Sequence, residues 1–187
     1  MRIIAGELKG RTLQAPTWDG LRPTSDRLRE TLFNVVAPAI VGARVLDGYA
    51  GTGAVGIEAL SRGAAEVVFV ERDRRAVALI ESNLARCGVR DRHVIIRSDL
   101  AAATGMARAA PFDLVFLDPP YGRAGLDEAL HAGEALMATD TLLIIEHARR
   151  DEAPASHGAL RRTRTLRSGD SALAFYRLAD EGSSVLT

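Results

Sequence analysis

Short apolar runs alternate with amphipathic segments from residue 43 to residue 146, and this alternation constrains the fold more than any other feature. Apolar runs bounded by turn residues are typical of buried parallel strands, and apolar residues spaced three and four apart are typical of helices. Successive β-α-β units predict a mostly parallel sheet with helices on both faces. The predicted strands are residues 43–47, 66–71, 93–97, 112–117 and 141–146, and the helices between them are residues 54–62, 73–87, 101–108 and 126–137.

The two ends of the chain add smaller elements to this sheet. Residues 160–166 and 172–178, joined by Ser168-Gly169-Asp170, predict an edge hairpin that brings the sheet to seven strands. Residues 2–15 alternate weakly around Gly6 and Gly10 and predict a small N-terminal β-hairpin, and residues 24–36 predict an amphipathic helix that ends before Pro38. We therefore expect residues 1–23 to form a hairpin and loop, residues 24–179 to form the main domain, and residues 180–187 to form a frayed tail.

Several classes of protein are disfavoured by composition. No apolar stretch is long enough to span a bilayer, and the first residues lack the apolar region of a signal peptide, so we expect a cytoplasmic protein with no membrane contact. The four histidines are widely spaced and the single Cys87 precedes Gly88 in a helical pattern, which predicts no metal site and an inert thiol.

The net charge is zero, but the charges are distributed unevenly. Residues 1–30 carry six Lys/Arg against four Asp/Glu, residues 147–177 carry seven against three, and the remainder carries eleven against seventeen. If both basic ends lie on one face, that face can receive the phosphates of a nucleic acid. The alternative is that these arginines are simply solvated surface.

Asp118-Pro119-Pro120-Tyr121 follows the apolar run 112–117, where the chain leaves a predicted parallel strand. Open α/β sheets bind ligands at this end of their strands, and the two prolines end the hydrogen-bond ladder there. The Asp118 carboxylate and a freed carbonyl can both accept hydrogen bonds from an NH2 group, while Tyr121 can stack on the ring that carries it. The motif favours methyl transfer to an exocyclic nitrogen; the alternative is a simple strand-ending turn.

A glycine-rich loop, residues 47–56, follows the first predicted strand and opens a helix. Gly51 to Gly56 also fits G-x-G-x-x-G, and Glu71 lies at the distance expected for a ribose-binding acid, so an NAD-dependent oxidoreductase is a competing interpretation. However, Asp47 places a carboxylate near the position of a diphosphate, which is electrostatically unfavourable. A cationic ligand with an amino-acid end, such as S-adenosylmethionine, fits the loop better.

In this interpretation, acidic residues at three strand ends hold the cofactor. Glu71 accepts hydrogen bonds from the ribose hydroxyls, and Asp99 accepts one from the adenine amino group. The alternatives are a surface acid for Glu71 and helix capping, together with Ser98, for Asp99. The predicted cofactor-binding residues are Asp47, Tyr49, Ala50, Gly51, Gly53, Glu71, Arg72, Asp99 and Leu100.

With these motifs in this order, the chain resembles the S-adenosylmethionine-dependent amino-methyltransferases of class I Rossmann-like fold. More narrowly, it resembles the RsmD-type bacterial family, which methylates guanine N2 in small-subunit ribosomal RNA. Gly48 and Tyr49 stand where that family more often has Leu and Phe. The stretches that carry the resemblance are residues 2–6, 9–11, 22–34, 50–53, 58–64, 118–121 and 169–172, and residues 22–34 are the most specific to the family.

The resemblance implies the reaction and its residues. Asp118 and the Pro119 carbonyl, with Pro120 completing the motif, would orient the guanine N2 amine while Tyr121 stacks on the extruded base. Methyl transfer would be direct, without a covalent enzyme intermediate. The substrate would be 16S rRNA within an assembled or assembling 30S particle, bound by a monomeric enzyme. The candidate substrate-binding residues are Arg2, Lys9, Arg11, Arg22, Thr24 and Arg27.

Methylation of another amine remains an alternative within the same chemistry. DNA adenine methyltransferases usually carry a larger target-recognition segment than this chain has room for. Enzymes that methylate protein glutamine typically have Asn where this chain has Asp118.

Overall fold

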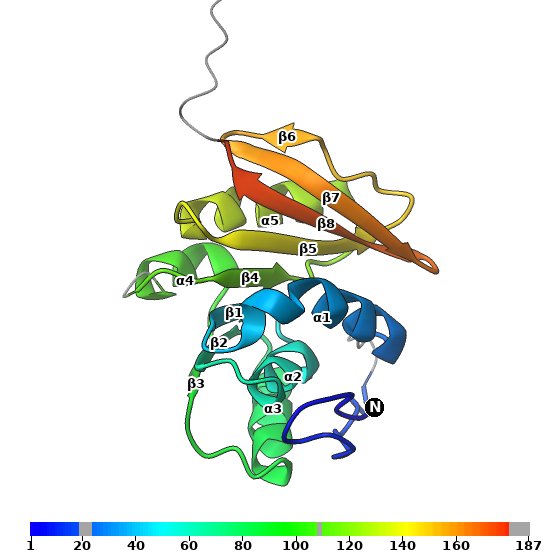
Figure 1. The fold of residues 1–187 in the computed structure, drawn as a ribbon, viewed down its shortest axis with the longest axis vertical. Helices are drawn as coiled ribbons and strands as arrows, with labels where there is room; N and C mark the ends of the chain where they lie inside the picture. The colour runs from blue at the N-terminus through cyan, green and yellow to red at the C-terminus, as the bar shows by residue number, and fades with distance from the viewer. Residues whose placement is uncertain (19–23, 108–109, 180–187) are drawn as a thin grey trace, which may run out of the picture.

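Five parallel strands form one side of the sheet in the computed structural model, which describes residues 1–18, 24–107 and 110–179 (Figure 1). Register pairs such as Leu46–Val68 and Leu117–Ile145 align their carboxyl ends along one edge. The prediction of a mostly parallel sheet is therefore confirmed. The strands are β1 (Arg44–Gly48), β2 (Glu66–Val70), β3 (His93–Ile96), β4 (Leu114–Leu117) and β5 (Leu142–Ala148).

Three antiparallel strands extend the sheet beyond β5. They are β6 (Ser156–His157), β7 (Leu160–Ser168) and β8 (Ser171–Leu178), and the order across the sheet is β3-β2-β1-β4-β5-β8-β7-β6. The short β6, which pairs only two residues with β7, is one strand more than the seven expected. Because β8 runs antiparallel beside β5, the β7–β8 turn lies at the same edge as the carboxyl ends of the parallel strands.

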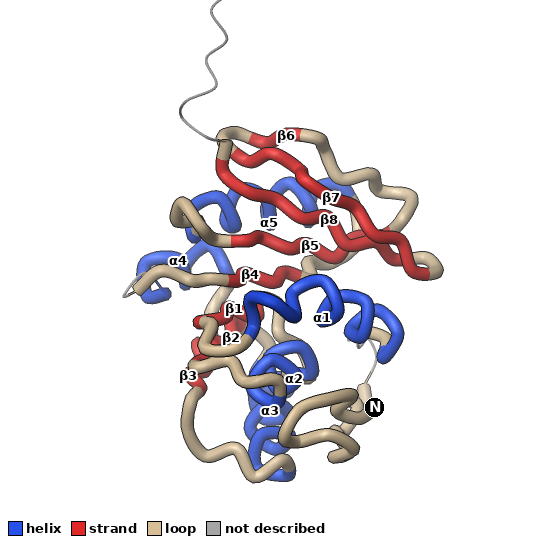
Figure 2. The backbone as a smooth tube through the Cα atoms, in the orientation of Figure 1, coloured by secondary structure: helices blue, strands red, loops and turns tan. Residues whose placement is uncertain are grey.

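Helices cover both faces of the sheet (Figure 2). Buried side chains of α1 (Asp26–Ile40), α2 (Ala54–Ser61) and α3 (Arg74–Arg86) form one core cluster with the sheet. Buried side chains of α4 (Leu100–Ala107) and α5 (Arg123–Leu136) form a second cluster on the opposite face. This arrangement is the doubly wound architecture that the β-α-β alternation predicts.

Local signals in the sequence explain where α1 and α3 begin. The Ser25 hydroxyl accepts the N–H of Leu28 and caps α1, and Asp73 caps α3 as predicted by accepting the N–H of Arg75. α1 was expected to end before Pro38, but it continues through that residue to Ile40. Ile40 is buried in the core cluster, so packing of the last turn outweighs the hydrogen bond that the proline removes.

Residues 1–14 pack against α2 and α3. They pair through a single antiparallel bridge, Arg2 with Thr12, and not through a longer two-stranded ladder. Ile3, Leu8 and Leu13 are buried in the same core cluster as α1 and α2. The segment therefore contributes to the hydrophobic core of the main sheet.

Within the described residues, none of the helices combines the length and the apolar character needed to cross a bilayer. Cys87, at the end of α3, is buried and reduced, and burial raises the pKa of its thiol.

Candidate functional site

A cavity of about 970 Å³ opens at the carboxyl ends of β1, β2, β4 and β5. It brings together most of the residues expected from the glycine-rich loop and from Asp118-Pro119-Pro120-Tyr121. The predicted site residues that line it are Thr24, Arg27, Asp47, Tyr49, Ala50, Gly51, Glu71, Arg72, Asp99, Leu100, Asp118, Pro119, Pro120 and Tyr121.

Five predicted residues are not placed in the cavity wall. Gly53 lies in the loop beneath it, with a φ of 73°, where it caps the start of α2. The side chains of Arg2, Lys9 and Arg11 are exposed on the N-terminal segment and are not among the described residues that line the cavity. Arg22 lies outside the residues that the structure describes.

Asp47 lies near the end of β1 with only 2% of its surface exposed. Its carboxyl oxygen accepts the N–H of Gly56 at 2.8 Å, which ties the first turn of α2 to the strand. Burial raises the pKa of Asp47 to about 8; the Gly56 hydrogen bond opposes this shift, and the negative charge of Glu71 adds to it. A buried carboxyl of this kind favours a cationic ligand, which would stabilise its ionised form, and disfavours a diphosphate.

Glu71 follows β2 and is 8% exposed, so the alternative of a surface acid is wrong. One carboxylate oxygen accepts the N–H of Gly51 at 2.9 Å, and the other accepts the N–H of Asp73 at 2.8 Å. Glu71 therefore fixes the glycine-rich loop as well as lining the cavity.

Tyr49 adopts a left-handed backbone conformation, with φ of 59°, between β1 and the glycines. For a residue other than glycine this conformation costs on the order of 1–3 kcal/mol, and such residues cluster at functional sites. Burial raises the pKa of its hydroxyl to about 12. The neighbouring Gly48 leaves a space that the side chain of Leu117 fills, since a Cβ there would lie 2.4 Å from Leu117 Cδ2.

Arg72 and Asp99 occupy the exposed rim of the cavity. Their side chains form an ion pair of 3.3 Å and are 71% and 61% exposed. Such a pair contributes little to stability, so either side chain is available to a ligand at small cost.

The Asp118-Pro119-Pro120-Tyr121 motif begins where β4 ends. The N–H of Asp118 donates to the carbonyl of Gly48 at 3.3 Å, and the two prolines have no N–H to continue the ladder. Tyr121 remains 42% exposed, and its hydroxyl lies 3.2 Å from the Ser171 hydroxyl at the start of β8. Gly125, in the first turn of α5, allows that helix to approach the motif, because a Cβ there would lie 2.3 Å from the Pro120 carbonyl oxygen.

Several residues of the cavity wall were missed by the sequence interpretation. They include Trp18, whose ring lies 5.0 Å from the Arg75 guanidinium, and Glu146, two residues before the end of β5. The β7–β8 turn, Ser168 to Ser171, also lines the cavity. The turn residues were visible in the sequence, but their position depends on the antiparallel pairing of β8 with β5.

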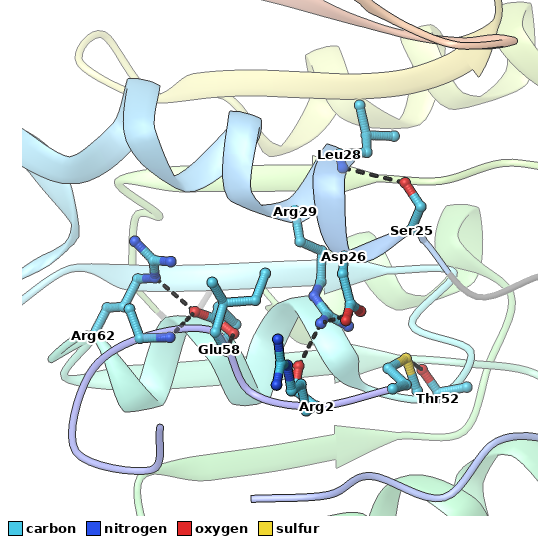
Figure 3. Close-up of polar contacts among 11 residues, drawn as sticks. Arg2, Ser25, Asp26, Leu28, Arg29, Thr52, Glu58 and Arg62 are labelled. Atoms are coloured by element: carbon cyan, nitrogen blue, oxygen red, sulfur yellow. Dashed lines mark hydrogen bonds and ion pairs between the residues drawn. The ribbon is translucent and has the colours of Figure 1, made fainter. Parts of the chain in front are cut away.

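Buried charges attach the N-terminal segment to the helices beside the cavity (Figure 3). Glu58, fully buried on α2, accepts the N–H groups of Ile4 at 2.8 Å and Ala5 at 3.0 Å, and also pairs with Arg62. Arg29, fully buried on α1, donates to the carbonyl of Arg2 at 2.6 Å. The segment thus connects α2 with the first turns of α1.

Arg29 also donates to Asp26 at 2.9 Å. Burial lowers the pKa of Arg29, while the negative charges of Asp26 and Glu58 oppose the shift. The segment reaches the glycine-rich loop as well, because Asn83 donates to the carbonyl of Thr52 and accepts the N–H of Gln14.

Comparison with known proteins gives consistent matches over most of the chain. Residues 1–177 match the family described as Conserved hypothetical protein 95. The Bacillus subtilis protein YlbH, which carries a provisional rRNA methyltransferase name, is 37% identical over 181 residues, covering 95% of this chain and 98% of its own. Ribosomal RNA small subunit methyltransferase D of Escherichia coli is 40% identical over 148 residues, covering 78% of this chain and 74% of its own. The solved structure of Escherichia coli yhhF is 37% identical, with a TM-score of 0.80 and coverage of 95% of this chain and 97% of that one.

Proposed function

The chain belongs to the Conserved hypothetical protein 95 family, the RsmD-type family, and on that premise we propose that it methylates N2 of a guanine in small-subunit ribosomal RNA, using S-adenosylmethionine. One observation carries this proposal. Asp118-Pro119-Pro120-Tyr121 opens into the same cavity as the buried acids Asp47 and Glu71. A cation-binding end and an amine-orienting end therefore share one space.

The donor set of the cavity fits S-adenosylmethionine. Asp47 offers a buried carboxyl whose ionised form a cationic ligand stabilises, and Glu71 offers oxygens for the ribose hydroxyls. Asp99 and Leu100, which also line the cavity, are assigned to the adenine. When bound, this cofactor supplies an electrophilic methyl group on a sulfonium.

The residues of the motif prepare the amine for the transfer. Asp118 and the Pro119 carbonyl accept its two N–H hydrogens, which directs the nitrogen lone pair into the cavity. Tyr121, part exposed beside Ser171, provides a face on which the base stacks. Alignment of two reactants can lower a barrier by about 7–11 kcal/mol, and Asp118 also accepts the proton that the amine loses.

The RNA must present an extruded base to this cavity. Extrusion costs a few kcal/mol, which contacts to the phosphates can offset. We assign these contacts to residues 1–23, as an RNA-binding extension of the domain of residues 24–179, and to Thr24 and Arg27 at the rim. A small basic surface of this kind suits a target base that an assembled or assembling small subunit holds in place. We also propose that the enzyme is cytoplasmic and monomeric.

The test is transfer of radiolabelled methyl from S-adenosylmethionine to naked RNA and to small ribosomal subunits from cells that lack this protein. The labelled RNA is digested to nucleosides, with Asp118→Ala as the inactive control. Label in N2-methylguanosine is the expected result. Label in another nucleoside or in protein would overturn the assignment of the target but would still show methyltransferase activity. Tight binding of NAD without binding of S-adenosylmethionine would overturn the assignment of the cofactor.

A further inference from the structure

Glu146 stands beside Asp118 at the carboxyl edge of the sheet. Leu117 of β4 is paired in register with Ile145 of β5, so Asp118 and Glu146 are the next residues of two neighbouring parallel strands. Both line the cavity. A second carboxyl group therefore accompanies the one that is proposed to orient the amine.

The alternation of side chains along the strands places both acids on one face. Phe116 and Ile144 belong to the core cluster beneath α1, and Asp118 and Glu146 follow two residues later on their strands. Glu146 is also paired with Leu173 of β8, a member of the same cluster. Only 3% of Glu146 is exposed, which places its carboxyl group in the wall and not on the outer rim.

The Watson–Crick edge of guanine carries two adjacent donors, N1–H and the N2 amine. Asp118 and the Pro119 carbonyl are assigned to the amine, which leaves N1–H to a neighbouring acceptor. We propose that Glu146 accepts N1–H and thereby selects guanine; this inference rests on the proposed function and names a specificity-determining residue for it. A hydrogen bond from N1–H to a carboxylate also shifts electron density through the N1–C2–N2 unit toward N2, which makes the amine a better nucleophile.

The same contact rejects bases that lack N1–H. In adenine and 2-aminopurine, N1 carries a lone pair, which would face the carboxylate oxygen, so that two acceptors meet and repel each other. Sites that are built to hydrogen-bond a substrate group discriminate strongly against analogues without it, because a buried polar group is then unpaired. 2-Aminopurine is the informative probe, since it keeps the amine at C2 and lacks N1–H; it also lacks O6, so the effect of N1 is read from how a Glu146 substitution changes the preference.

The experiment compares kcat/KM for the RNA that the wild-type enzyme methylates with kcat/KM for the same RNA carrying 2-aminopurine at the modified position. Wild type is expected to prefer guanine by about 100-fold or more. Glu146→Gln should narrow this preference at least about tenfold, because its amide can donate to N1 of 2-aminopurine. Glu152→Gln, an exposed residue that does not line the cavity, serves as the matched control and should keep the wild-type preference.

If Glu146 has only a structural role, Glu146→Gln would lower kcat/KM for the guanine RNA and for the 2-aminopurine RNA by the same factor. The ratio of the two values would then stay at the wild-type value, and that result would overturn the inference. Thermal melting tests whether Glu146→Gln is folded. If that variant does not fold, Glu146→Met replaces it. Glu146→Met should also narrow the preference for guanine over 2-aminopurine, because it removes both the acceptor for N1–H of guanine and the repulsion of N1 of 2-aminopurine. Failure of the proposed function has a different signature, since wild type would then form no N2-methylguanosine at all.

Discussion

The carboxylate of Glu71 accepts the backbone N–H of Gly51 at 2.9 Å, so the acid that follows β2 holds the loop that follows β1. Its second oxygen holds the N–H of Asp73, the cap of α3. One side chain thus fixes the loop, the start of a helix and part of the cavity wall. The proposed contact with the ribose would be made by a group that is already oriented by its neighbours.

Replacing Glu71 is expected to weaken cofactor binding without unfolding the protein. Glu71→Gln leaves one acceptor oxygen for two backbone donors, and we expect the Kd for S-adenosylmethionine to rise by about tenfold or more, with a larger rise for Glu71→Ala. Isothermal titration calorimetry measures both. Glu66→Gln, at the opposite end of the same strand, is the control and should bind normally. Wild-type affinity in Glu71→Ala would contradict the assignment.

Asp47 is expected to make the stability of the ligand-free protein depend on pH. Its pKa is raised to about 8 in the folded protein from an ordinary value of 3.8, so between these values the folded state retains a proton that the unfolded state has released. The free energy of unfolding therefore falls as pH rises through this window. Asp47→Asn, which keeps an acceptor for Gly56, should match wild type near pH 4 and exceed its stability by roughly a few kcal/mol above pH 8.

Thermal melting of both proteins from pH 4 to pH 9 measures this difference. Asp140→Asn, at an exposed position, controls for the substitution itself. A difference between Asp47→Asn and wild type that stays constant with pH would be inconsistent with a buried, proton-retaining Asp47.

Asp118→Asn separates the chemical role of the motif from its structural role. The amide keeps the shape of the side chain and removes its charge and its capacity to accept a proton. We expect kcat to fall by about 100-fold or more while the Kd for S-adenosylmethionine and the melting temperature stay close to wild type. Single-turnover methyl transfer is the measurement. Loss of folding in this variant would instead support the alternative that the motif is only a strand-ending turn.

Glu58→Ala is expected to destabilise the protein strongly. The substitution leaves the N–H groups of Ile4 and Ala5 unpaired and removes a buried negative charge beside Arg29. Breaking a buried charge network from one side typically costs about 3–5 kcal/mol. Urea unfolding should show this loss, and limited proteolysis should show earlier cleavage within residues 1–14. Arg62→Ala removes only one partner of Glu58 and should lower the free energy of unfolding by less. If both variants lower it equally, the Glu58 carboxylate does not hold residues 1–14 in place.

The basic residues of the N-terminal segment are expected to set the salt dependence of RNA binding. Combined Arg2→Gln, Lys9→Gln and Arg11→Gln should lower the slope of log Kd against log salt by about 2, as expected for three lost phosphate contacts on single-stranded RNA. Arg161→Gln with Arg177→Gln, paired across β7 and β8 at the other end of the sheet, should leave the slope unchanged. If each removed charge changes the slope equally in the N-terminal variant and in the β7–β8 variant, the salt dependence reflects general surface charge and not contacts of the N-terminal segment.

The sequence predicted the order of elements well because each β-α-β unit carries its own periodicity and its own caps, as Asp73 does for α3. It also identified the strand-end acids, since the carboxyl ends of parallel strands must meet at one edge. What it missed depends on pairing between distant segments. Ser171 reaches the cavity only because β8 returns beside β5, and the two-residue β6 forms only where β7 provides a partner. Glu146 is different, because it closes a strand that the sequence predicted and its place at the carboxyl edge was overlooked.

The end of α1 and the placement of residues 1–14 were missed for a similar reason. Pro38 is a local stop signal, but the burial of Ile40 outweighs it. The alternation around Gly6 and Gly10 predicted a hairpin, and backbone hydrogen bonds such as Ile3 to Arg11 do close the segment on itself, but its attachment to Glu58, Ser61 and Asn83 was not foreseen. These partners lie 53 to 69 residues further along the chain, beyond the reach of any local pattern.

That separation also has a consequence during protein synthesis. Residues 1–14 leave the ribosome before their partners, because Glu58 and Asn83 are made 54 and 69 residues after the residues of the segment that they bind. At about 5–20 residues per second, the segment waits several seconds without its partners while Ile3, Leu8 and Leu13 are unprotected. The segment can therefore dock only once α2 and α3 have been made, and a chain whose synthesis stops before α3 is complete would carry unburied apolar side chains.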